Sequence, residues 1–100
     1  MERYIIMITV YKYIINPNQE EIVIKVPRGI RPFSVGLDPA GAPCFWAFID
    51  TDAEEVEMNF YCIGTGWPAD RILEKENNVQ AIGSIKEGRY MWHVLMGGER

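Results

Sequence analysis

The stretch Asp38-Pro39-Ala40-Gly41-Ala42-Pro43-Cys44-Phe45-Trp46-Ala47-Phe48-Ile49-Asp50 is a proline- and glycine-rich turn that runs directly into a strand without a polar face. Successive side chains of a strand point to opposite sides. One face would carry Cys44, Trp46 and Phe48, and the other would carry Phe45, Ala47 and Ile49. Because both faces are apolar, the strand needs cover on two sides, from a second sheet, the interior of a small barrel or another copy of the chain. The stretch therefore predicts the centre of the fold, but no chemistry.

Length and composition describe one ordinary globular domain. The chain has 100 residues, of which 48% are hydrophobic and 24% are charged, so it can bury a single core but not two. Its formal charge is −4 and its pI is about 4.9. Phosphate contacts need clustered Lys and Arg, so we do not expect a nucleic-acid partner.

The cysteines and the N-terminal segment indicate the compartment. Cys44 and Cys62 are the only cysteines, and neither belongs to a CxxC motif or a Cys/His ligand set. The sequence therefore predicts no disulfide framework, no metal site and no cofactor. Residues 4–15 are strongly apolar, but Thr9 and Lys12 interrupt them, and a membrane helix needs roughly 20 apolar residues. We expect a cytoplasmic protein without a membrane partner.

Proline and glycine recur at short intervals between runs of Ile, Val, Tyr, Phe and Trp, a pattern typical of an all-β sandwich or barrel. We predict strands near residues 4–15, 20–26, 31–37, 43–50, 55–63, 79–85 and 90–96. One short helix is expected at 68–75, where Pro68 suits a first helical position. The predicted fold is a single, mainly β domain over residues 1–100, an antiparallel β-sandwich or small barrel of about seven strands with one short helix.

Alternation and turn chemistry add detail to this fold. In residues 21–26 and 55–63 the even-numbered side chains are apolar and should face the core, while Glu57 and Asn59 lie on the other face, so the strand at 55–63 should be half exposed. Turn-forming side chains at 16–19 predict a hairpin between the first two strands. Residues 86–89 predict a second hairpin between the last two strands.

The first predicted strand is apolar on both faces, which is a liability at a chain terminus unless its edge is paired. Two interpretations remain open: the strand lies between two neighbours in one monomer, or it pairs with a second subunit. Neither leaves the strand free, and we predict a homo-oligomer, a dimer or larger.

Gly64-Thr65-Gly66-Trp67-Pro68 leads from a strand toward the predicted helix, and backbone amides in such a turn can bind an anion. The lysine of a P-loop and the third glycine of a dinucleotide fingerprint are both missing. The glycines are therefore better explained by a turn that needs positive φ. Trp67 is more informative, since a loop aromatic can stack on a base or fill a partner's pocket.

Carboxylates crowd the segment that follows the central strand: Asp50, Asp52, Glu54, Glu55 and Glu57. Their spacing resembles the opening of a calcium loop, but Glu55 replaces the required Gly and Tyr61 stands in place of the bidentate Glu. A solvated turn explains the cluster, and so does an acidic patch that docks on a basic protein surface.

No catalytic residues are assigned. His93 is the only histidine, and a Cys-His-Asp set built from it with Asp50 and either Cys44 or Cys62 lacks any local signature. A half-buried structural role for His93 is the favoured interpretation.

Several short motifs together resemble a family of small uncharacterised proteins, a domain of unknown function encoded by bacteriophages and prophages. The motifs are Tyr11-Lys12-Tyr13, Pro27-Arg28-Gly29, GxPCxWAxxD at 41–50, Gly64-Thr65-Gly66-x-Pro68, Ile82-Gly83-Ser84 and Trp92-His93-Val94. The resemblance covers about residues 10–96 and leaves residues 1–9 as an N-terminal extension. It implies a small accessory protein in the host cytoplasm, and it implies no mechanism.

The leading hypothesis is a non-enzymatic phage accessory protein that binds and modulates a host protein, for example as an anti-defence inhibitor such as an anti-CRISPR. Its partner-binding residues would be Asp50, Asp52, Glu54, Glu55 and Trp67. The alternative is a small-molecule binder that sequesters a nucleotide signal. Its ligand-binding residues would be Gly64, Thr65, Gly66, Trp67, Arg28 and Arg31. A structural phage protein or an enzyme ranks third.

Overall fold

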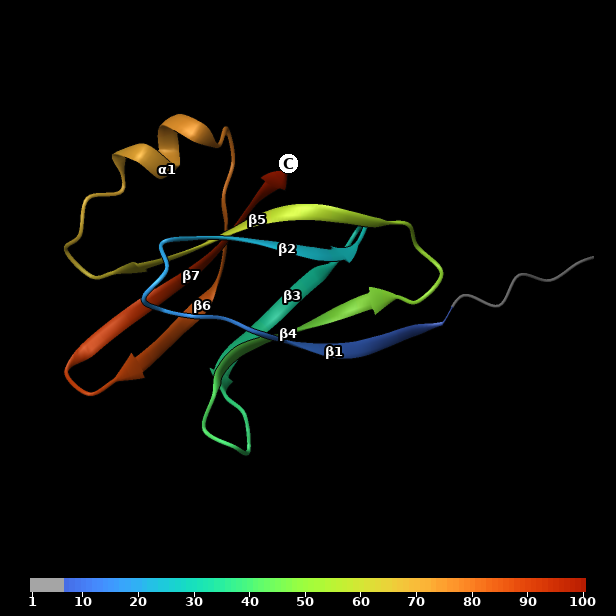
Figure 1. Cartoon of the computed structure of the whole chain (residues 1–100), viewed down its shortest axis with the longest axis horizontal. Helices are drawn as coiled ribbons and strands as arrows, with labels where there is room; N and C mark the ends of the chain where they lie inside the picture. The colour runs from blue at the N-terminus through green and yellow to red at the C-terminus, as the bar shows by residue number, and fades with distance from the viewer. Residues whose placement is uncertain (1–6) are drawn as a thin grey trace, which may run out of the picture.

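The computed structural model describes residues 7–100 and arranges them as two antiparallel sheets and one short helix (Figure 1). Sheet A has the strand order β1-β4-β3, and sheet B has the order β2-β5-β7-β6. The elements are β1 (Ile8–Ile14), β2 (Glu21–Pro27), β3 (Arg31–Leu37), β4 (Pro43–Asp50), β5 (Glu55–Gly64), α1 (Asp70–Lys75), β6 (Gln80–Glu87) and β7 (Tyr90–Glu99). The predicted fold class is confirmed in its sandwich form, since the two sheets do not close into a barrel.

Most predicted bounds lie within a few residues of the observed ones. The first strand was expected from residue 4, but residues 4–6 lie outside the described residues, and β1 begins at Ile8. The helix begins at Asp70 with Ala69 as its N-cap, so Pro68 lies one residue before the cap and not at the first helical position as predicted. β7 continues three residues further than expected, to Glu99.

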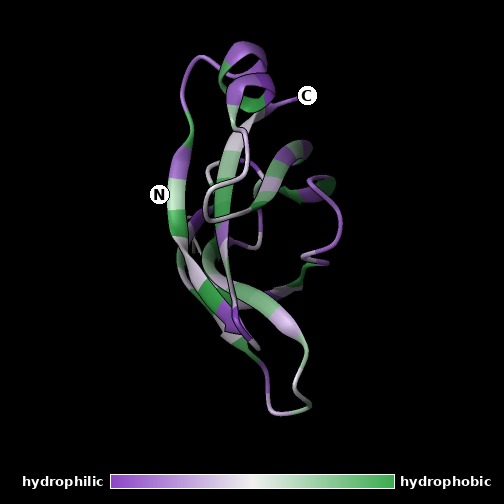
Figure 2. Cartoon of the chain, turned by 90° about the vertical axis from the view of Figure 1, so that its left-hand side faces the viewer, coloured by the Kyte–Doolittle hydropathy of each residue, from purple (hydrophilic) through white to green (hydrophobic). Residues whose placement is uncertain are grey.

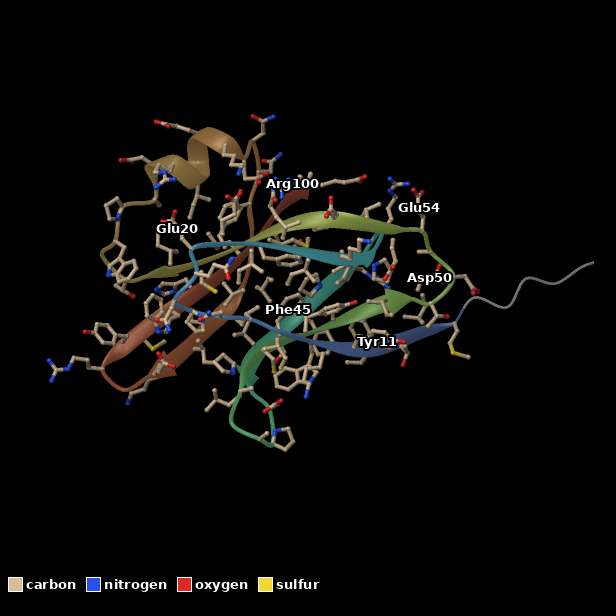
Figure 3. The ribbon with its side chains drawn as sticks, viewed as in Figure 1. Tyr11, Glu20, Phe45, Asp50, Glu54 and Arg100 are labelled. Atoms are coloured by element: carbon tan, nitrogen blue, oxygen red, sulfur yellow. The ribbon has the colours of Figure 1, made fainter. Side chains whose placement is uncertain are left out.

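The main core lies between the two sheets. From β4, Phe45 and Ala47 are completely buried and Ile49 is nearly so. The Phe45 ring stacks on Tyr13 at a centroid distance of 5.2 Å and on Phe60 at 4.9 Å. Figure 3 shows Phe45 in the middle of the molecule, between the strands of the two sheets. One column of three aromatic rings therefore connects β1 and β4 of sheet A to β5 of sheet B.

The predicted hairpin between the first two strands is wrong, although its turn forms. The Gln19 amide donates to the Asn16 carbonyl at 3.0 Å, but β1 pairs with β4 while β2 pairs with β5. The chain crosses from one sheet to the other at this turn, and Ile15 is buried at the crossing. β1 and β2 thus cover the core from opposite sides, which a hairpin within one sheet could not do. The second predicted hairpin is confirmed, with Glu87 opposite Tyr90.

The helix α1 covers the face of sheet B that points away from sheet A. Its buried Ile72 packs against Tyr61 and Ile63 of β5, and Figure 2 shows the rest of the helix to be mainly hydrophilic. A helix of this length is marginal alone, so this apolar contact stabilises it.

A carboxylate, Glu76, fixes the C-terminal end of α1 to the sheet. It accepts hydrogen bonds from the Tyr61 hydroxyl at 2.6 Å, the Asn59 amide at 3.1 Å and the Gly98 backbone N–H at 2.8 Å. Burial opposes ionisation, but these hydrogen bonds outweigh it and lower the pKa of Glu76. Gly97 is required beside it, because a Cβ there would lie 2.5 Å from a Glu76 oxygen. Asn59, which the alternation placed on the exposed face of its strand, is buried by this contact.

The two faces of β4 give a direct test of where the stability of the fold resides. Phe45→Ala should lower the free energy of unfolding by about 3–5 kcal/mol, because it opens a cavity between the sheets. Phe48→Ala is the matched control on the same strand and should cost about 1 kcal/mol or less, since its ring is 41% exposed. Urea denaturation followed by circular dichroism measures both values. Equal losses would contradict the assignment of the core to the Phe45 face.

Candidate functional site

One face of sheet A has no cover from the described residues of the chain. We call it the outer face, and its large apolar side chains are Ile8, Val10, Ile14, Phe33, Trp46 and Phe48. Phe33 is 47% exposed and Phe48 is 41% exposed. The sequence predicted that both faces of β4 would be covered, and within one chain only the Phe45 face is. A contiguous exposed apolar face of this kind is typical of an interaction surface.

An aromatic pair forms the centre of the outer face. A register shift between Pro32 and Ser34 inserts Phe33 as an extra residue of β3, and its ring stacks on Phe48 with the centroids 4.5 Å apart. The Arg31 guanidinium lies 5.9 Å from the centre of the Phe48 ring, a cation–π contact. Arg31, a predicted ligand-binding residue, is therefore part of this aromatic group.

An ion pair closes one end of the same face. The Lys12 ammonium donates to Asp38 at 2.8 Å, and the Asp38 side chain is almost fully buried. Asp38 also accepts the backbone N–H groups of Ala40 and Ala42, which fixes the turn before β4. The hydrogen bond from Lys12 and the one from Ala42 lower the pKa of Asp38. The Lys12–Asp38 pair therefore stabilises this end of the outer face, and the buried Cys44 lies near it.

The predicted acidic patch lies at the opposite end of the outer face. Asp50 is the last residue of β4 and pairs with Ile8, so the β4–β5 turn begins beside the apolar side chains. Asp50 accepts the N–H of Asp52 at 2.9 Å, Glu54 follows in the turn, and Glu55 is the first residue of β5. Figure 3 shows Asp50 and Glu54 at the same end of the molecule. The structure therefore brings these four predicted carboxylates to one end of the molecule, where Asp50 borders the outer face and Glu54 pairs with Arg28, which follows β2 of sheet B.

Trp67, the fifth predicted partner-binding residue, lies far from that patch. The acidic turn precedes β5 and Trp67 follows it, so a strand of 10 residues, roughly 30 Å, separates them (Figure 1). The Trp67 ring packs on Gly64 and meets the edge of Trp92 at 5.0 Å. It belongs to a separate aromatic cluster, and one partner surface containing all five residues would have to extend along the whole molecule.

The predicted nucleotide-binding residues do not converge. The amides of Thr65 and Trp67 already donate to the carbonyls of Met91 and Gly64, so the loop is a closed turn. Arg28 lies at the other end of β5, where it forms ion pairs with Glu54 at 2.7 Å and Glu99 at 2.9 Å. Arg31 belongs to the outer face of sheet A. The remaining member of the loop, Gly66, has a φ of +85° and serves the turn.

The concave and nucleophilic features of the described residues offer little for catalysis. A pocket of about 70 Å³ lies beside α1, far smaller than the roughly 300–1,000 Å³ of usual ligand sites. It is lined by Glu20, Glu21, Tyr61, Arg71, Ile72 and Lys75. Within residues 7–100 no group of three or more His, Cys, Asp or Glu side chains is arranged to hold a metal ion.

His93 and the cysteines do not form a nucleophilic set. The two ring nitrogens of His93 contact the hydroxyls of Thr65 at 2.7 Å and Ser84 at 2.8 Å. Burial raises the pKa of Cys62 to about 11 and also raises that of Cys44. Both thiols are therefore protonated, poor nucleophiles, and the histidine is engaged by hydroxyl groups.

Sequence reasoning did not assign the apolar residues of the outer face to a site. Its signal was present, because residues 8–14 are apolar on both faces and β4 has no polar face. No sequence pattern indicated that Phe33 lies on the outer face, because its position depends on the register shift in the pairing of β3 with β4.

Comparison with known protein families identifies a match over nearly the whole chain. A family described as a domain of unknown function, DUF7352, matches residues 7–99, which includes all seven strands and α1. No curated protein and no solved structure matches the chain significantly. Among residues 7–100, no helix has the length and apolar character needed to cross a membrane.

The ion pair at the border of the outer face predicts a pH-dependent contribution to stability. The pKa of Asp38 is lowered in the folded chain, so its contribution is present above the ordinary carboxyl pKa of about 3.9 and is lost as the pH falls through the folded value. We expect Asp38→Asn to lower the melting temperature at pH 7 and to differ less from the wild type at pH 3. Asp52→Asn is the control, because the Asp52 carboxylate accepts no hydrogen bond within residues 7–100. A difference that is the same at both pH values would contradict the role of the Asp38 charge.

Proposed function

Because the chain belongs to the DUF7352 family, described as a domain of unknown function, we propose a function from its surface: it is a non-enzymatic protein-binding module. The single observation that carries this proposal is the uncovered outer face of sheet A, with the stacked Phe33 and Phe48 at its centre. The partner docks on this face.

The composition of the outer face supports the proposal. Protein interfaces combine an apolar, aromatic centre with a polar rim, and aromatic and Arg side chains supply most of the binding energy. Here Phe33, Phe48 and Arg31 form the centre, and carboxylates of the β4–β5 turn form the rim. The rings of Phe33 and Phe48 are already stacked in the free chain, so little side-chain entropy is lost on binding.

The charges at the rim define the chemistry of the partner. The chain has a formal charge of −4, and Asp52 and Glu55 are exposed at the end of the outer face. The complementary surface is an apolar patch bordered by Lys or Arg, which these carboxylates would steer into place. Binding should therefore weaken as the salt concentration rises.

The biological setting is the finer part of the proposal. The sequence motifs resemble those of small phage and prophage proteins, and this resemblance supports an accessory protein that modulates a host factor in the host cytoplasm. Inhibition of a host defence system is one such activity. Sequestration of a nucleotide is the alternative, and the observation that favours it is the Trp67 side chain, which is 51% exposed.

We expect a host protein to co-purify stoichiometrically with the tagged wild-type chain from its bacterial host, as measured by native mass spectrometry. The double substitution Phe33→Ala/Phe48→Ala should reduce the amount of recovered partner at least 10-fold, because the loss of two hot-spot aromatic side chains weakens the binding free energy by more than about 1.4 kcal/mol. Asp52→Lys/Glu55→Lys should also reduce recovery, and it spares the ion pair of Glu54 with Arg28.

Trp67→Ala is the matched control, since it removes an exposed aromatic side chain at the far end of β5. It should leave partner recovery unchanged. Equal recovery by the wild type and the double Phe variant would contradict the proposed surface. An added mass of a few hundred daltons that disappears in Trp67→Ala would support nucleotide binding instead.

A further inference from the structure

The first strand is an edge with one neighbour. β1 pairs with β4, and no other strand among residues 7–100 pairs with it. Figure 1 shows β1 along the border of the molecule, with no strand beyond it. One of the two interpretations of this apolar strand, that it lies between two neighbours in the monomer, is therefore wrong.

The hydrogen-bonding groups of β1 divide by residue parity. The Ile15 amide donates to the Pro43 carbonyl, and the Thr51 amide donates to the Met7 carbonyl, at the two ends of the ladder with β4. In an antiparallel ladder the hydrogen-bonded pairs alternate with pairs that are not hydrogen-bonded. The odd-numbered residues of β1 therefore bond to β4. The even-numbered residues, Ile8, Val10, Lys12 and Ile14, direct their N–H and C=O groups away from the sheet.

This edge lacks the usual protection against pairing. Natural edge strands carry a proline, a bulge or free charged side chains. β1 has no proline, its pairing with β4 has no register shift, and its single charged side chain, Lys12, is held by Asp38. The opposite edge of sheet A differs, because β3 contains Pro32 and a register shift and contacts Gly83 of β6 through Val35.

We propose that β1 pairs with β1 of a second copy of the chain, antiparallel and centred on Tyr11, to form a symmetric dimer. The occupant is a second copy because the strand is self-complementary in this register. Ile8 lies opposite Ile14 of the partner subunit, Thr9 opposite the partner's Tyr13, and Tyr11 opposite the partner's Tyr11. Apolar and aromatic pairs of this kind stabilise neighbouring strands. This inference does not depend on the proposed partner-binding function.

The parity of the free groups selects the register. Only registers that pair even-numbered residues with even-numbered residues can join the outward N–H and C=O groups of both strands. Centring the pair on Lys12 would place two ammonium groups opposite each other, which is unfavourable. Centring it on Val10 would leave Ile14 opposite residue 6, outside β1. Centring it on Tyr11 uses every outward group of residues 8–14.

The same parity places both outer faces on one side of the dimer. Paired residues of antiparallel strands point to the same side, and the even-numbered residues of β1 belong to the outer face. The two copies of sheet A become one six-stranded sheet, with the strand order β3-β4-β1 followed by its symmetry mate. Its two outer faces form a single continuous surface.

Disulfide trapping tests the register. Tyr11→Cys should form a covalent dimer under mild oxidation with glutathione disulfide at low micromolar concentration, because paired residues have Cα atoms about 4.5–5.5 Å apart. Thr9→Cys is the matched control on the same face of β1, outside the aromatic column of the core, and its two copies would lie roughly 14 Å apart at ~3.4 Å per residue. The native Cys44 and Cys62 are buried and do not compete. Equal trapping of both variants, or trapping of Thr9→Cys alone, would overturn the proposed register.

Proline substitution tests the interface itself. We expect the wild type to sediment as a dimer at micromolar concentration and Val10→Pro to sediment as a folded monomer, because the Val10 N–H is not used by β4. Tyr11→Pro is the control, because its N–H faces β4 and its loss should destabilise the fold. A wild-type chain that is monomeric at 100 μM would overturn the dimer. A monomeric wild-type chain that still recovers the host protein would overturn the dimer and leave the proposed function standing, and a dimeric wild-type chain that recovers no partner would do the reverse, so the two proposals fail separately.

Discussion

The stacking of Tyr13, Phe45 and Phe60 is the contact on which both sheets depend. Phe45 is completely buried and lies within 5.2 Å of one ring and 4.9 Å of the other. It belongs to β4, the middle strand of sheet A, so its position sets the positions of β1 and β3 through the backbone ladder on either side. The apolar inner face of sheet A needs cover from a second layer, and the aromatic column joins it to sheet B.

Burying one face of β4 leaves the other face unsupported, and this asymmetry separates stability from recognition. The helix α1 covers Tyr61 and Ile63 on the outward side of sheet B, whereas the outer face of sheet A receives no such layer from the described residues. Phe33 and Phe48 therefore remain exposed, although packing their rings against another part of the chain would have stabilised the fold. Aromatic side chains in such a place are better explained by binding than by folding.

The features predicted from sequence are those that depend on neighbours along the chain. The strands and their inward side chains follow from a period of two, and the turns follow from local backbone chemistry. The pairing of β1 with β4, and not with β2, depends on which apolar faces meet across the core, so the hairpin predicted from residues 16–19 was wrong although its turn forms. The burial of Asn59 depends on Glu76, which lies 17 residues away. The sequence could not show how far apart the predicted partner-binding residues lie, because β5 places the acidic turn and Trp67 at its opposite ends.

The edge of β1 and the outer face of sheet A share the same residues, and this couples two kinds of recognition. Ile8, Val10 and Ile14 place their side chains on the outer face and their free backbone groups along the edge. An antiparallel strand that pairs with those groups continues sheet A beyond β1. Its side chains alternate between the two faces of the sheet, so those on the outer side extend the outer face and do not cover it. Pairing at the edge therefore enlarges the apolar surface and leaves it open to a further partner. A second layer stacked on the face, by contrast, would leave the backbone groups of the edge unpaired, so neither contact alone satisfies this side of the molecule.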